Sequence, residues 1–301
     1  MSARIFVDGE SGTTGLSIAQ RLRAQPGYAL ISLEDAHRKN LSARADAMAR
    51  ADLTVLCLPD DAARQAVALA PAGTRFLDAS TAHRTTPGWV YGFAELAKDH
   101  AGKIAAAPLV ANPGCFATGA IALLRPLIAS GILPVDYSLT INAVSGYSGG
   151  GKAMIAEHES QGGPPFELYA LGLSHKHVPE IMLYSGLSRR PIFAPSVGHF
   201  AQGMLVCIPL FLEDLADEPT GHELSEAYRE YYNNTANITV RPGIYSGTLE
   251  PEGLNGTDQL EIFVCGNTNY GHAILIARLD NLGKGAAGAA AQNIALMLGG
   301  T

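Results

Sequence analysis

Short apolar runs alternate with segments of helical periodicity over the first third of the chain. The runs are short enough to be buried strands, and the segments between them place apolar residues three and four positions apart, as amphipathic helices do. Strands are predicted at 4–8, 28–33, 52–59 and 75–78, and helices at 16–22, 45–50 and 60–70, the last capped by Asp60. This alternation predicts a parallel sheet that binds ligands at the carboxyl ends of its strands.

The pattern changes beyond Gly131-Ile132-Leu133-Pro134. Strand-like runs now follow one another with less helix between them, which is typical of a mixed or antiparallel sheet and so of a second domain. These runs lie at 137–144, 204–212, 238–241, 259–265 and 273–279. An Ala/Gly-rich stretch at 280–293 then leads into a final apolar helix. In that stretch the spacing of Gly285 and Gly288 leaves one helix face bare for close packing.

Composition limits the class of protein. The 301 residues are 47% hydrophobic and 16% charged, as in an ordered globular chain of about two domains. A net charge of −7 argues against nucleic acid or an anionic membrane as partner. The start of the chain leads directly into a strand-like run, and no apolar run approaches the ~20 residues of a transmembrane helix. Neither a signal peptide nor a membrane span is therefore expected.

Four scattered cysteines lack the paired spacing of a zinc site. They are Cys57, Cys115, Cys207 and Cys265. Reduced thiols in the cytoplasm fit this pattern best.

A glycine-rich turn follows the first predicted strand. Gly9, Ser11, Gly12, Thr13, Thr14 and Gly15 belong to the sequence Gly9-Glu10-Ser11-Gly12-Thr13-Thr14-Gly15. A glycine turn between a strand and a helix lets the backbone approach a dinucleotide pyrophosphate at the helix N-terminus. The spacing here is G-x-x-G-x-x-G rather than the commoner G-x-G-x-x-G. A turn that binds no ligand is the alternative.

The residues after the second strand leave the choice of dinucleotide open. Glu34 and Asp35 are placed to bind a ribose 2′-hydroxyl. Arg38 and Lys39, a few residues later, are instead suited to a 2′-phosphate.

Cys115 begins a predicted helix. Pro113 and Gly114 mark a turn, and an apolar segment at 116–130 follows. The N–H groups and dipole of a helix N-terminus stabilise a thiolate, which favours a nucleophile, although a buried structural cysteine is the alternative. The strand ends at Leu58-Pro59 and Ser80-Thr81 are expected to converge with this turn.

Residues 146–153 match the G-x-x-x-x-G-K part of a phosphate-binding loop. A true P-loop requires Ser or Thr after the lysine to hold magnesium, and Ala153 has no hydroxyl. An NTPase is therefore disfavoured. Lys152 and the glycine amides remain candidates for a smaller anion.

A dense group of polar side chains occurs at His175-Lys176-His177-Val178-Pro179-Glu180. The group has no cysteines and no clear third ligand, so a metal site is the least favoured interpretation. A histidine that acts as general acid/base for Cys115 is favoured instead. In an extended segment His175 and His177 share one face. The other histidines have no comparable group of polar residues beside them in sequence and are expected to be ordinary surface or core residues. They are the histidines at 37, 83, 100, 158, 199, 222 and 272.

Together these motifs resemble the shorter form of the N-acetyl-γ-glutamyl-phosphate reductases, in the semialdehyde dehydrogenase superfamily. The resemblance covers nearly the whole chain. It rests on the glycine turn, on Asn112-Pro113-Gly114-Cys115-Phe116-Ala117-Thr118, on the His175–Glu180 motif and on Asp280-Asn281-Leu282-Gly283-Lys284-Gly285-Ala286-Ala287-Gly288. Two departures are Glu10, an acid near the expected pyrophosphate, and the extra glycine in the loop from Ser145 to Lys152.

The resemblance implies a Rossmann-like NADP-binding α/β domain of residues 1–115 plus 281–301. An α+β catalytic and dimerisation domain of residues 116–280 is inserted before the C-terminal helix. It also implies reduction of an acyl phosphate in arginine biosynthesis, with release of phosphate, by a cytoplasmic homodimer or homotetramer.

The resemblance also assigns roles to residues. Cys115 is the implied nucleophile and His177 or His175 the acid/base. The implied NADP(H) contacts are the glycine turn (9, 11–15), Arg38, Lys39, Pro59, Ser80 and Asn281. The implied substrate contacts are Asn112, Arg84, Ser145, Gly146, Lys152, Tyr169 and Glu180. Rival functions are an aspartate-type semialdehyde dehydrogenase, a non-catalytic NADP-binding sensor and, least of all, a P-loop kinase.

Overall fold

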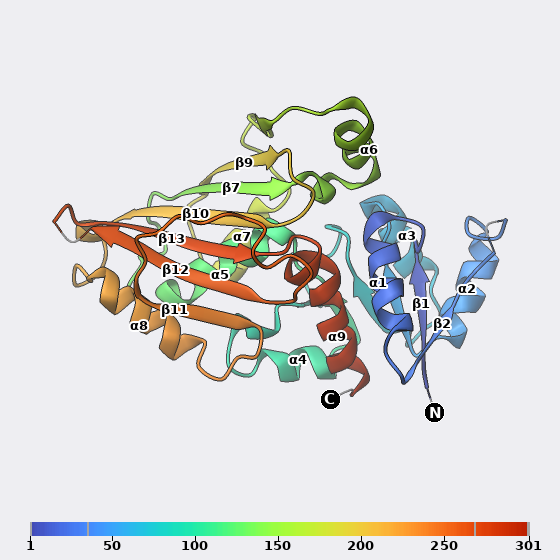
Figure 1. The fold of residues 1–301 in the computed structure, drawn as a ribbon. Coiled ribbons are helices and arrows are strands. Elements are labelled where there is room, and N and C mark those ends of the chain that lie inside the picture. Colours follow the sequence, from blue (N-terminus) through green and yellow to red (C-terminus); the bar gives the residue numbers. More distant parts are fainter. Residues whose placement is uncertain (1, 35, 268, 300–301) are drawn as a thin grey trace. The chain divides into compact units, whose positions relative to one another are not determined.

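The computed structural model of the chain describes residues 2–34, 36–267 and 269–299. Two compact units form, one from residues 1–113 with 286–301 and the other from residues 114–285 (Figure 1). Asp35, one of the two candidate acids for a ribose hydroxyl, lies outside the described residues.

The first unit is built on a six-stranded sheet in the order β2-β1-β3-β4-β6-β5, with every recorded pairing parallel. Its strands are β1 (Ala3–Asp8), β2 (Tyr28–Ile31), β3 (Leu53–Leu56), β4 (Phe76–Asp78), β5 (Val90–Tyr91) and β6 (Leu109–Ala111). Its helices are α1 (Thr13–Arg23), α2 (Leu41–Arg50), α3 (Asp60–Leu69), α4 (His100–Ala106) and α9 (Gly288–Leu298), with a short 3-10 turn, η1 (Ala94–Leu96). The predicted α/β class and parallel sheet are confirmed.

Both faces of this sheet are covered, as parallel sheets require. Ile5 and Val7 of β1 join a cluster that includes residues of α1, α4 and α9. Phe6, between them in sequence, points to the opposite face and packs with residues of α2 and α3. The period-2 alternation of a strand thus divides one apolar run between two cores.

Some details differ from the sequence expectation. Strands β5 and β6 were not predicted, because two or three apolar residues give no readable period, and the short helix α4 was not predicted either. Asp60 does not cap α3, since it is the first residue of that helix and Pro59 precedes it. The Asp60 carboxylate instead accepts hydrogen bonds from the Thr81 N–H (3.0 Å) and the Thr81 hydroxyl (2.5 Å).

The second unit contains a seven-stranded mixed sheet in the order β11-β12-β13-β10-β7-β9-β8. Pairs β7–β9 and β11–β12 are parallel and the others antiparallel. The strands are β7 (Thr140–Gly146), β8 (Phe166–Leu168), β9 (Ile192–Gly198), β10 (Met204–Phe211), β11 (Ile238–Ile244), β12 (Leu260–Asn267) and β13 (His272–Leu279). The second sheet is therefore mixed, as predicted, and β8 and β9 are additions to the prediction.

Helices α5, α7 and α8 lie on one side of this sheet, behind it in Figure 1, and contact one another or its strands. The helical segments are α5 (Cys115–Ala129), α6 (Gly151–Gln161), α7 (Val178–Ser185) and α8 (Gly221–Tyr231), with short turns η2 (Tyr147–Gly150) and η3 (Leu212–Asp214) and a π-helical turn η4 (Gly283–Ala287). The π turn was not predicted, because the sequence 280–293 has the composition of an ordinary α-helix.

Helix α5 is buried along most of its length and contains Pro126. Proline has no N–H to donate to the carbonyl four residues earlier. That carbonyl, of Ala122, accepts a hydrogen bond from the Tyr232 hydroxyl at 2.9 Å instead. The neighbouring Leu123 carbonyl also accepts one, from the Tyr228 hydroxyl at 2.5 Å. Two tyrosines thus satisfy the interrupted helix inside the core.

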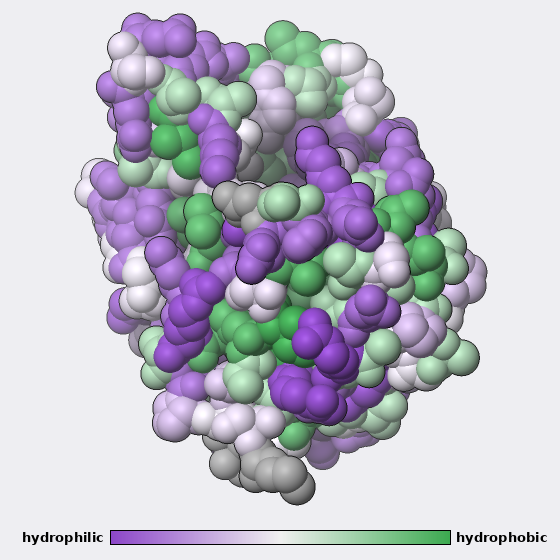
Figure 2. Space-filling model, turned by 90° about the vertical axis from the view of Figure 1, so that its right-hand side faces the viewer, coloured by the Kyte–Doolittle hydropathy of each residue, from purple (hydrophilic) through white to green (hydrophobic). Residues whose placement is uncertain are grey.

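On the face shown in Figure 2, hydrophobic residues lie scattered among hydrophilic ones. Such scattered apolar exposure is ordinary for a protein surface. Within the described ranges, every helix is too short or too polar to traverse a lipid bilayer.

Candidate active site

The glycine turn after β1 has a backbone that only glycine can follow. Gly9 has a φ of +89°, and a Cβ there would lie 2.3 Å from the Cys57 carbonyl oxygen. A Cβ on Gly15 would lie 2.3 Å from the Gly9 carbonyl oxygen. Gly12 is the N-cap of α1, and it has no side chain to accept hydrogen bonds from the first-turn N–H groups. The turn therefore fits a phosphate group at the helix N-terminus.

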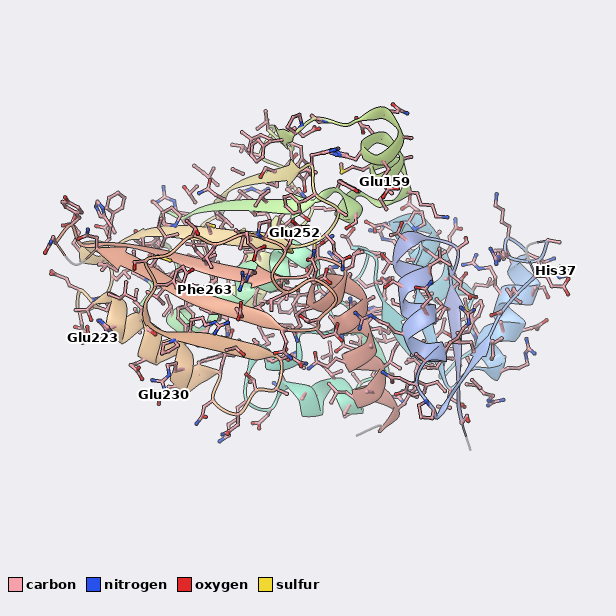
Figure 3. The ribbon with its side chains drawn as sticks, in the orientation of Figure 1. His37, Glu159, Glu223, Glu230, Glu252 and Phe263 are labelled. Carbon is pink, nitrogen blue, oxygen red and sulfur yellow. The ribbon has the colours of Figure 1, made fainter. Side chains whose placement is uncertain are left out.

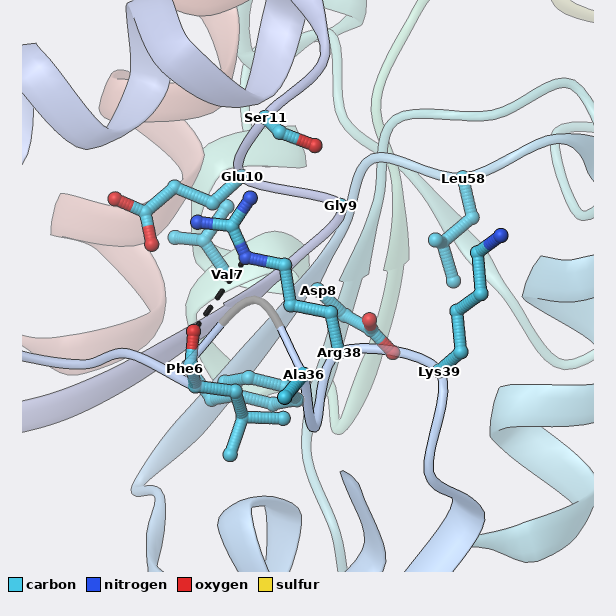
Figure 4. A pocket seen from close by; sticks show the side chains of 11 residues that line it. Phe6, Val7, Asp8, Gly9, Glu10, Ser11, Ala36, Arg38, Lys39 and Leu58 are labelled. Carbon is cyan, nitrogen blue, oxygen red and sulfur yellow. Dashed lines mark hydrogen bonds between the residues drawn. The ribbon is translucent and has the colours of Figure 1, made fainter. Parts of the chain in front are cut away.

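A cavity of about 390 Å³ opens beside this turn. Arg38 and Lys39 extend into it from the loop after β2 (Figure 4). Arg38 Nε also donates to the Leu33 carbonyl at 3.4 Å, the dashed line in Figure 4. The lining residues are Phe6, Val7, Asp8, Gly9, Glu10, Ser11, Leu33, Ala36, Arg38, Lys39 and Leu58.

Arginines neutralise both acids of the lining. Arg44 of α2 donates to one Asp8 oxygen through Nε (2.9 Å) and Nη2 (2.7 Å), and both side chains are buried. Burial raises the pKa of Asp8, and the Arg44 guanidinium opposes that rise. Glu10 forms an ion pair with Arg23 and accepts from the Ser32 hydroxyl at 3.1 Å. Glu10, the acid that departs from the family pattern, is thus paired with Arg23.

Polar residues that follow or end β4 and β6 are joined by hydrogen bonds. Asp78 accepts hydrogen bonds from the Ser80 N–H (2.9 Å), the Ser80 hydroxyl (2.8 Å) and the His83 ring (2.6 Å). Arg84 Nε donates to the Asn112 carbonyl at 2.9 Å. The His83 ring is buried and also stacks on Trp89, so His83 is a core residue, one of the two outcomes that the sequence allowed.

The Asn112 amide is occupied within the first unit. Its nitrogen donates to the Ala286 carbonyl and its oxygen accepts from Asn293, both at 3.0 Å. These bonds tie the residue after β6 to the π turn and to the middle of α9.

Cys115 is the first residue of α5, as the sequence predicts. The N-cap residue is Gly114, which provides no side-chain acceptor, and the Cys115 side chain is only partly buried. A Cβ on Gly285 would lie 2.9 Å from the Cys115 Cβ. The π turn that contains Gly285 therefore passes directly against the thiol-bearing residue.

An aromatic cluster gathers beside Cys115. The rings of His175 and His177 lie 4.7 Å apart, and each has its centroid 6.1 Å from that of Phe116. Tyr169 contacts His175, with its hydroxyl 3.4 Å from Nε2. Burial, and then the charge of a Cys115 thiolate, raise the pKa of Tyr169. The structure thus brings Cys115, both histidines and Tyr169 together.

The segment carrying the two histidines is a turn and not the extended strand that would place both on one face. His177 is the N-cap of α7 with helical φ and ψ, and its N–H donates to His175 Nδ1 at 3.1 Å. Pro179 explains the difference, because proline is favoured in the first turn of a helix.

Glu180 is buried and faces the Cys115 turn. Its carboxylate accepts a hydrogen bond from the Gly114 N–H at 3.1 Å. Among the candidate substrate contacts, Glu180 therefore supports the backbone that presents the thiol.

Asn281 is buried in the second unit. Its oxygen accepts from the Gly203 N–H at 2.8 Å and its nitrogen donates to the Ser148 hydroxyl at 2.9 Å. The neighbouring Asp280 accepts from Gln202, Gly256 and Leu282. Asn281 therefore holds the start of the glycine-rich loop through Ser148. Ser145 and Gly146 of this loop are buried, whereas Lys152 on α6 is exposed.

We expect Gly285→Ala to lower turnover by about 10²-fold. The new Cβ would lie 2.9 Å from the Cys115 Cβ and so displace Cys115. Misplacing a reacting group by about 1 Å lowers the rate by about that factor. Steady-state kinetics and a thermal melt measure it. Gly102→Ala in α4, where a Cβ meets nothing within 4 Å, is the control and should leave turnover unchanged. Equal activity of the two variants contradicts the close packing on Cys115.

Matches to family profiles cover most of the chain. Residues 4–104 match the profile described as semialdehyde dehydrogenase, NAD binding domain. Residues 115–281 match the profile described as semialdehyde dehydrogenase, dimerisation domain.

Solved structures of low sequence identity share the fold. Aspartate semialdehyde dehydrogenase II from Vibrio cholerae, complexed with ASA, has a TM-score of 0.72 at 16% identity, covering 99% of this chain and 98% of that one. The enzyme from Candida albicans with NADP has a TM-score of 0.69 at 14% identity, covering 99% of both chains.

Relatives of much higher identity carry one name. The N-acetyl-gamma-glutamyl-phosphate reductases of Brucella ovis and Brucella abortus are each 50% identical over 309 residues, covering 99% of this chain and 100% of theirs. The chain belongs to the N-acetyl-gamma-glutamyl-phosphate reductase family, within the semialdehyde dehydrogenases.

Proposed function

We propose that this chain reduces N-acetyl-γ-glutamyl phosphate to N-acetylglutamate semialdehyde and phosphate with NADPH. The observation that carries the proposal is the cluster of Cys115, His177 and Tyr169 at the N-terminus of α5, in a chain 50% identical to reductases of that name. The free thiols are consistent with a cytoplasmic enzyme of arginine biosynthesis.

In this mechanism Cys115 is the nucleophile. Its thiolate, favoured by the N–H groups at the start of α5, attacks the acyl carbon, and the C–O bond to phosphate breaks as the thioester forms. His177 holds the proton removed from the thiol and returns it to the departing phosphate oxygen. The N–H groups of the first turn of α5 stabilise the oxyanion that forms on the acyl oxygen.

The glycine turn and its cavity fit NADPH, as the positive φ of Gly9 and the cationic lining indicate. When bound, NADPH supplies the hydride that converts the thioester carbonyl to the aldehyde level. The C–S bond then breaks, and Cys115 leaves as the thiolate that attacks in the next cycle. His177 takes up one proton from solvent in each cycle, and this is the proton that the next departing phosphate receives. Arg84, Lys152 and Lys176 are the candidate cations for the substrate phosphate.

The reverse reaction tests the function. We expect NADP⁺ reduction that requires both N-acetylglutamate semialdehyde and inorganic phosphate. Aspartate semialdehyde, the substrate of the rival dehydrogenase, should react poorly. Equal use of both aldehydes, or activity without phosphate, contradicts the proposal. Binding of NADPH without any turnover supports the sensor alternative.

We infer a preference for NADPH over NADH from the charges of the cavity. Asp8 and Glu10 are each paired with an arginine, so Arg38 and Lys39 leave the cavity net positive. Arg38→Ala with Lys39→Ala should weaken NADPH selectively, because a hydrogen bond to a charged group contributes about 1.5–3 kcal/mol. Titration calorimetry with both dinucleotides measures this, with Arg64→Ala, on the exposed side of α3, as control. Equal loss for both dinucleotides would place the 2′-phosphate elsewhere and return Glu34 to consideration.

We also propose a homodimer, formed on the open face of the second sheet. Helices α5, α7 and α8 lie on one side of that sheet, and Phe211 and Ile274 are exposed (54% and 44%) on strands β10 and β13. The matching profile for this unit is described as a dimerisation domain, which supports a second copy as the partner. Analytical ultracentrifugation should give a dimer or a multiple of it, and a mass of 31.5 kDa would contradict the proposal.

A further inference from the structure

Helix α6 is attached to its unit by very little buried surface. Of residues 151–161, all of which the structure describes, His158 alone is buried, at 4% exposure. Most surface helices bury an apolar stripe. Here a titratable imidazole occupies the position that anchors the helix.

His158 is held by two aromatic partners from other segments. Its ring stacks on Tyr147 of η2 with centroids 4.7 Å apart and an interplanar angle of 17°. Its Nδ1 lies 2.8 Å from Nδ1 of His199, in the loop between β9 and β10. A Cβ on Gly163 would lie 2.8 Å from the His158 ring, so the chain after α6 also packs against it.

The segment that His158 anchors includes the glycine-rich loop. Backbone hydrogen bonds fix the start of that loop to the β9–β10 loop, from Tyr147 N–H to the Phe200 carbonyl and from Ser148 N–H to the Ala201 carbonyl, both at 3.0 Å. Gly149 and Gly150, which follow, are exposed and lead into α6 and Lys152. Beyond Ser148, the position of the loop therefore depends on how α6 packs against the rest of its unit.

We propose that His158 and His199 form a clasp that positions the glycine-rich loop and Lys152 for the substrate phosphate, and that acid opens this clasp. The proposal rests on the proposed function, because it takes this loop to be a substrate contact. His158 and His199 are positioning residues and do not touch the reacting atoms.

Proton counting explains why acid opens the clasp. A hydrogen bond between two imidazole nitrogens needs one donor and one acceptor, so it survives while at least one ring is neutral. Once both rings are protonated, neither Nδ1 can accept, and two positive charges face each other. Among the described residues, the other titratable group in contact with the pair is Tyr147, whose hydroxyl lies 3.5 Å from the Glu159 carboxylate (Figure 3). A tyrosine stays neutral at acid pH.

Hydrogen exchange of the full-length protein tests the clasp without reference to catalysis. Protection factors for peptides covering 147–161 are compared at pH 8 and pH 5, which bracket ordinary imidazole titration. We expect protection to fall by about tenfold or more at pH 5, the ratio that one lost hydrogen bond represents. His199→Asn should retain its protection at both pH values, because an amide can donate to neutral His158 or accept from the protonated ring. His222→Asn, an exposed histidine of α8, is the control and should behave like the wild type.

Kinetics at pH 8 test the positioning role. His158→Phe keeps a ring against Tyr147 but loses the bond to His199. We expect it to raise the Michaelis constant for the acyl phosphate by about tenfold with little change in turnover, whereas His199→Asn should stay near the wild type.

Unchanged protection between pH 8 and pH 5, or the same fall in His199→Asn, overturns the clasp. A clasp that opens while His158→Phe keeps a normal Michaelis constant overturns its role toward substrate. The proposed function fails separately, if the wild-type protein does not turn over N-acetyl-γ-glutamyl phosphate at any pH.

Discussion

Replacing Cys115 with serine should lower turnover by about 10⁴-fold or more and leave NADPH binding unchanged. A serine hydroxyl is far less acidic than a thiol, so the N–H groups of α5 cannot hold it as an anion, and the acyl group is not transferred. Stopped-flow detection of the phosphate burst and fluorescence titration of NADPH measure the two properties separately. Appreciable turnover by the serine variant is incompatible with a covalent mechanism.

The other three cysteines provide matched controls. Burial raises the pKa of Cys57 to about 12 and that of Cys207 to about 11, and it also raises the pKa of Cys265. Thiols with raised pKa values have little thiolate at neutral pH and react slowly. Iodoacetamide should therefore label Cys115 first, and acyl phosphate should protect it. Cys265→Ser should retain turnover, whereas fast labelling at Cys207 would contradict the assignment.

The first unit was largely predictable from sequence because its signals are local. A buried parallel strand is a continuous apolar run, and the turn at Gly9 to Gly15 needs glycine for steric reasons that any chain shares. The position of Cys115 at the start of α5 is equally predictable, because Pro113 and Gly114 mark a turn just before it. Strand β5, with Val90 and Tyr91 alone, is too short to produce such a signal.

The remaining features depend on residues far apart in sequence. Arg44 neutralises Asp8 from 36 positions away, and His199 meets His158 from 41. Neither residue of such a pair is unusual by itself, so His158 and His199 looked ordinary in the sequence. The hydrogen bond from the Gly114 N–H to the Glu180 carboxylate also joins residues far apart in sequence, so it could not be predicted. This bond shows that the carboxylate supports the Cys115 turn.

The two histidines beside Cys115 should differ sharply when each is replaced by asparagine. Burial, and then Lys176, lower the pKa of His175 to about 4, so this ring is neutral at pH 7. Its Nδ1 accepts the His177 N–H, which assigns its one proton to Nε2. With its lone pair engaged, His175 cannot accept a proton from the thiol. His177 is therefore the acid/base that we propose.

We expect His177→Asn to lower turnover by about 10²–10⁴-fold and to flatten the neutral limb of the pH–rate profile. His175→Asn is the matched control, since its side-chain oxygen can still accept the His177 N–H and preserve the turn. It should lower turnover by less than about tenfold and keep the profile, while raising the Michaelis constant if this ring contacts substrate. Single-turnover acylation measured from pH 5 to pH 9 separates the two. A flattened profile in His175→Asn, with a normal one in His177→Asn, would reverse the assignment and require a different partner for the His177 N–H.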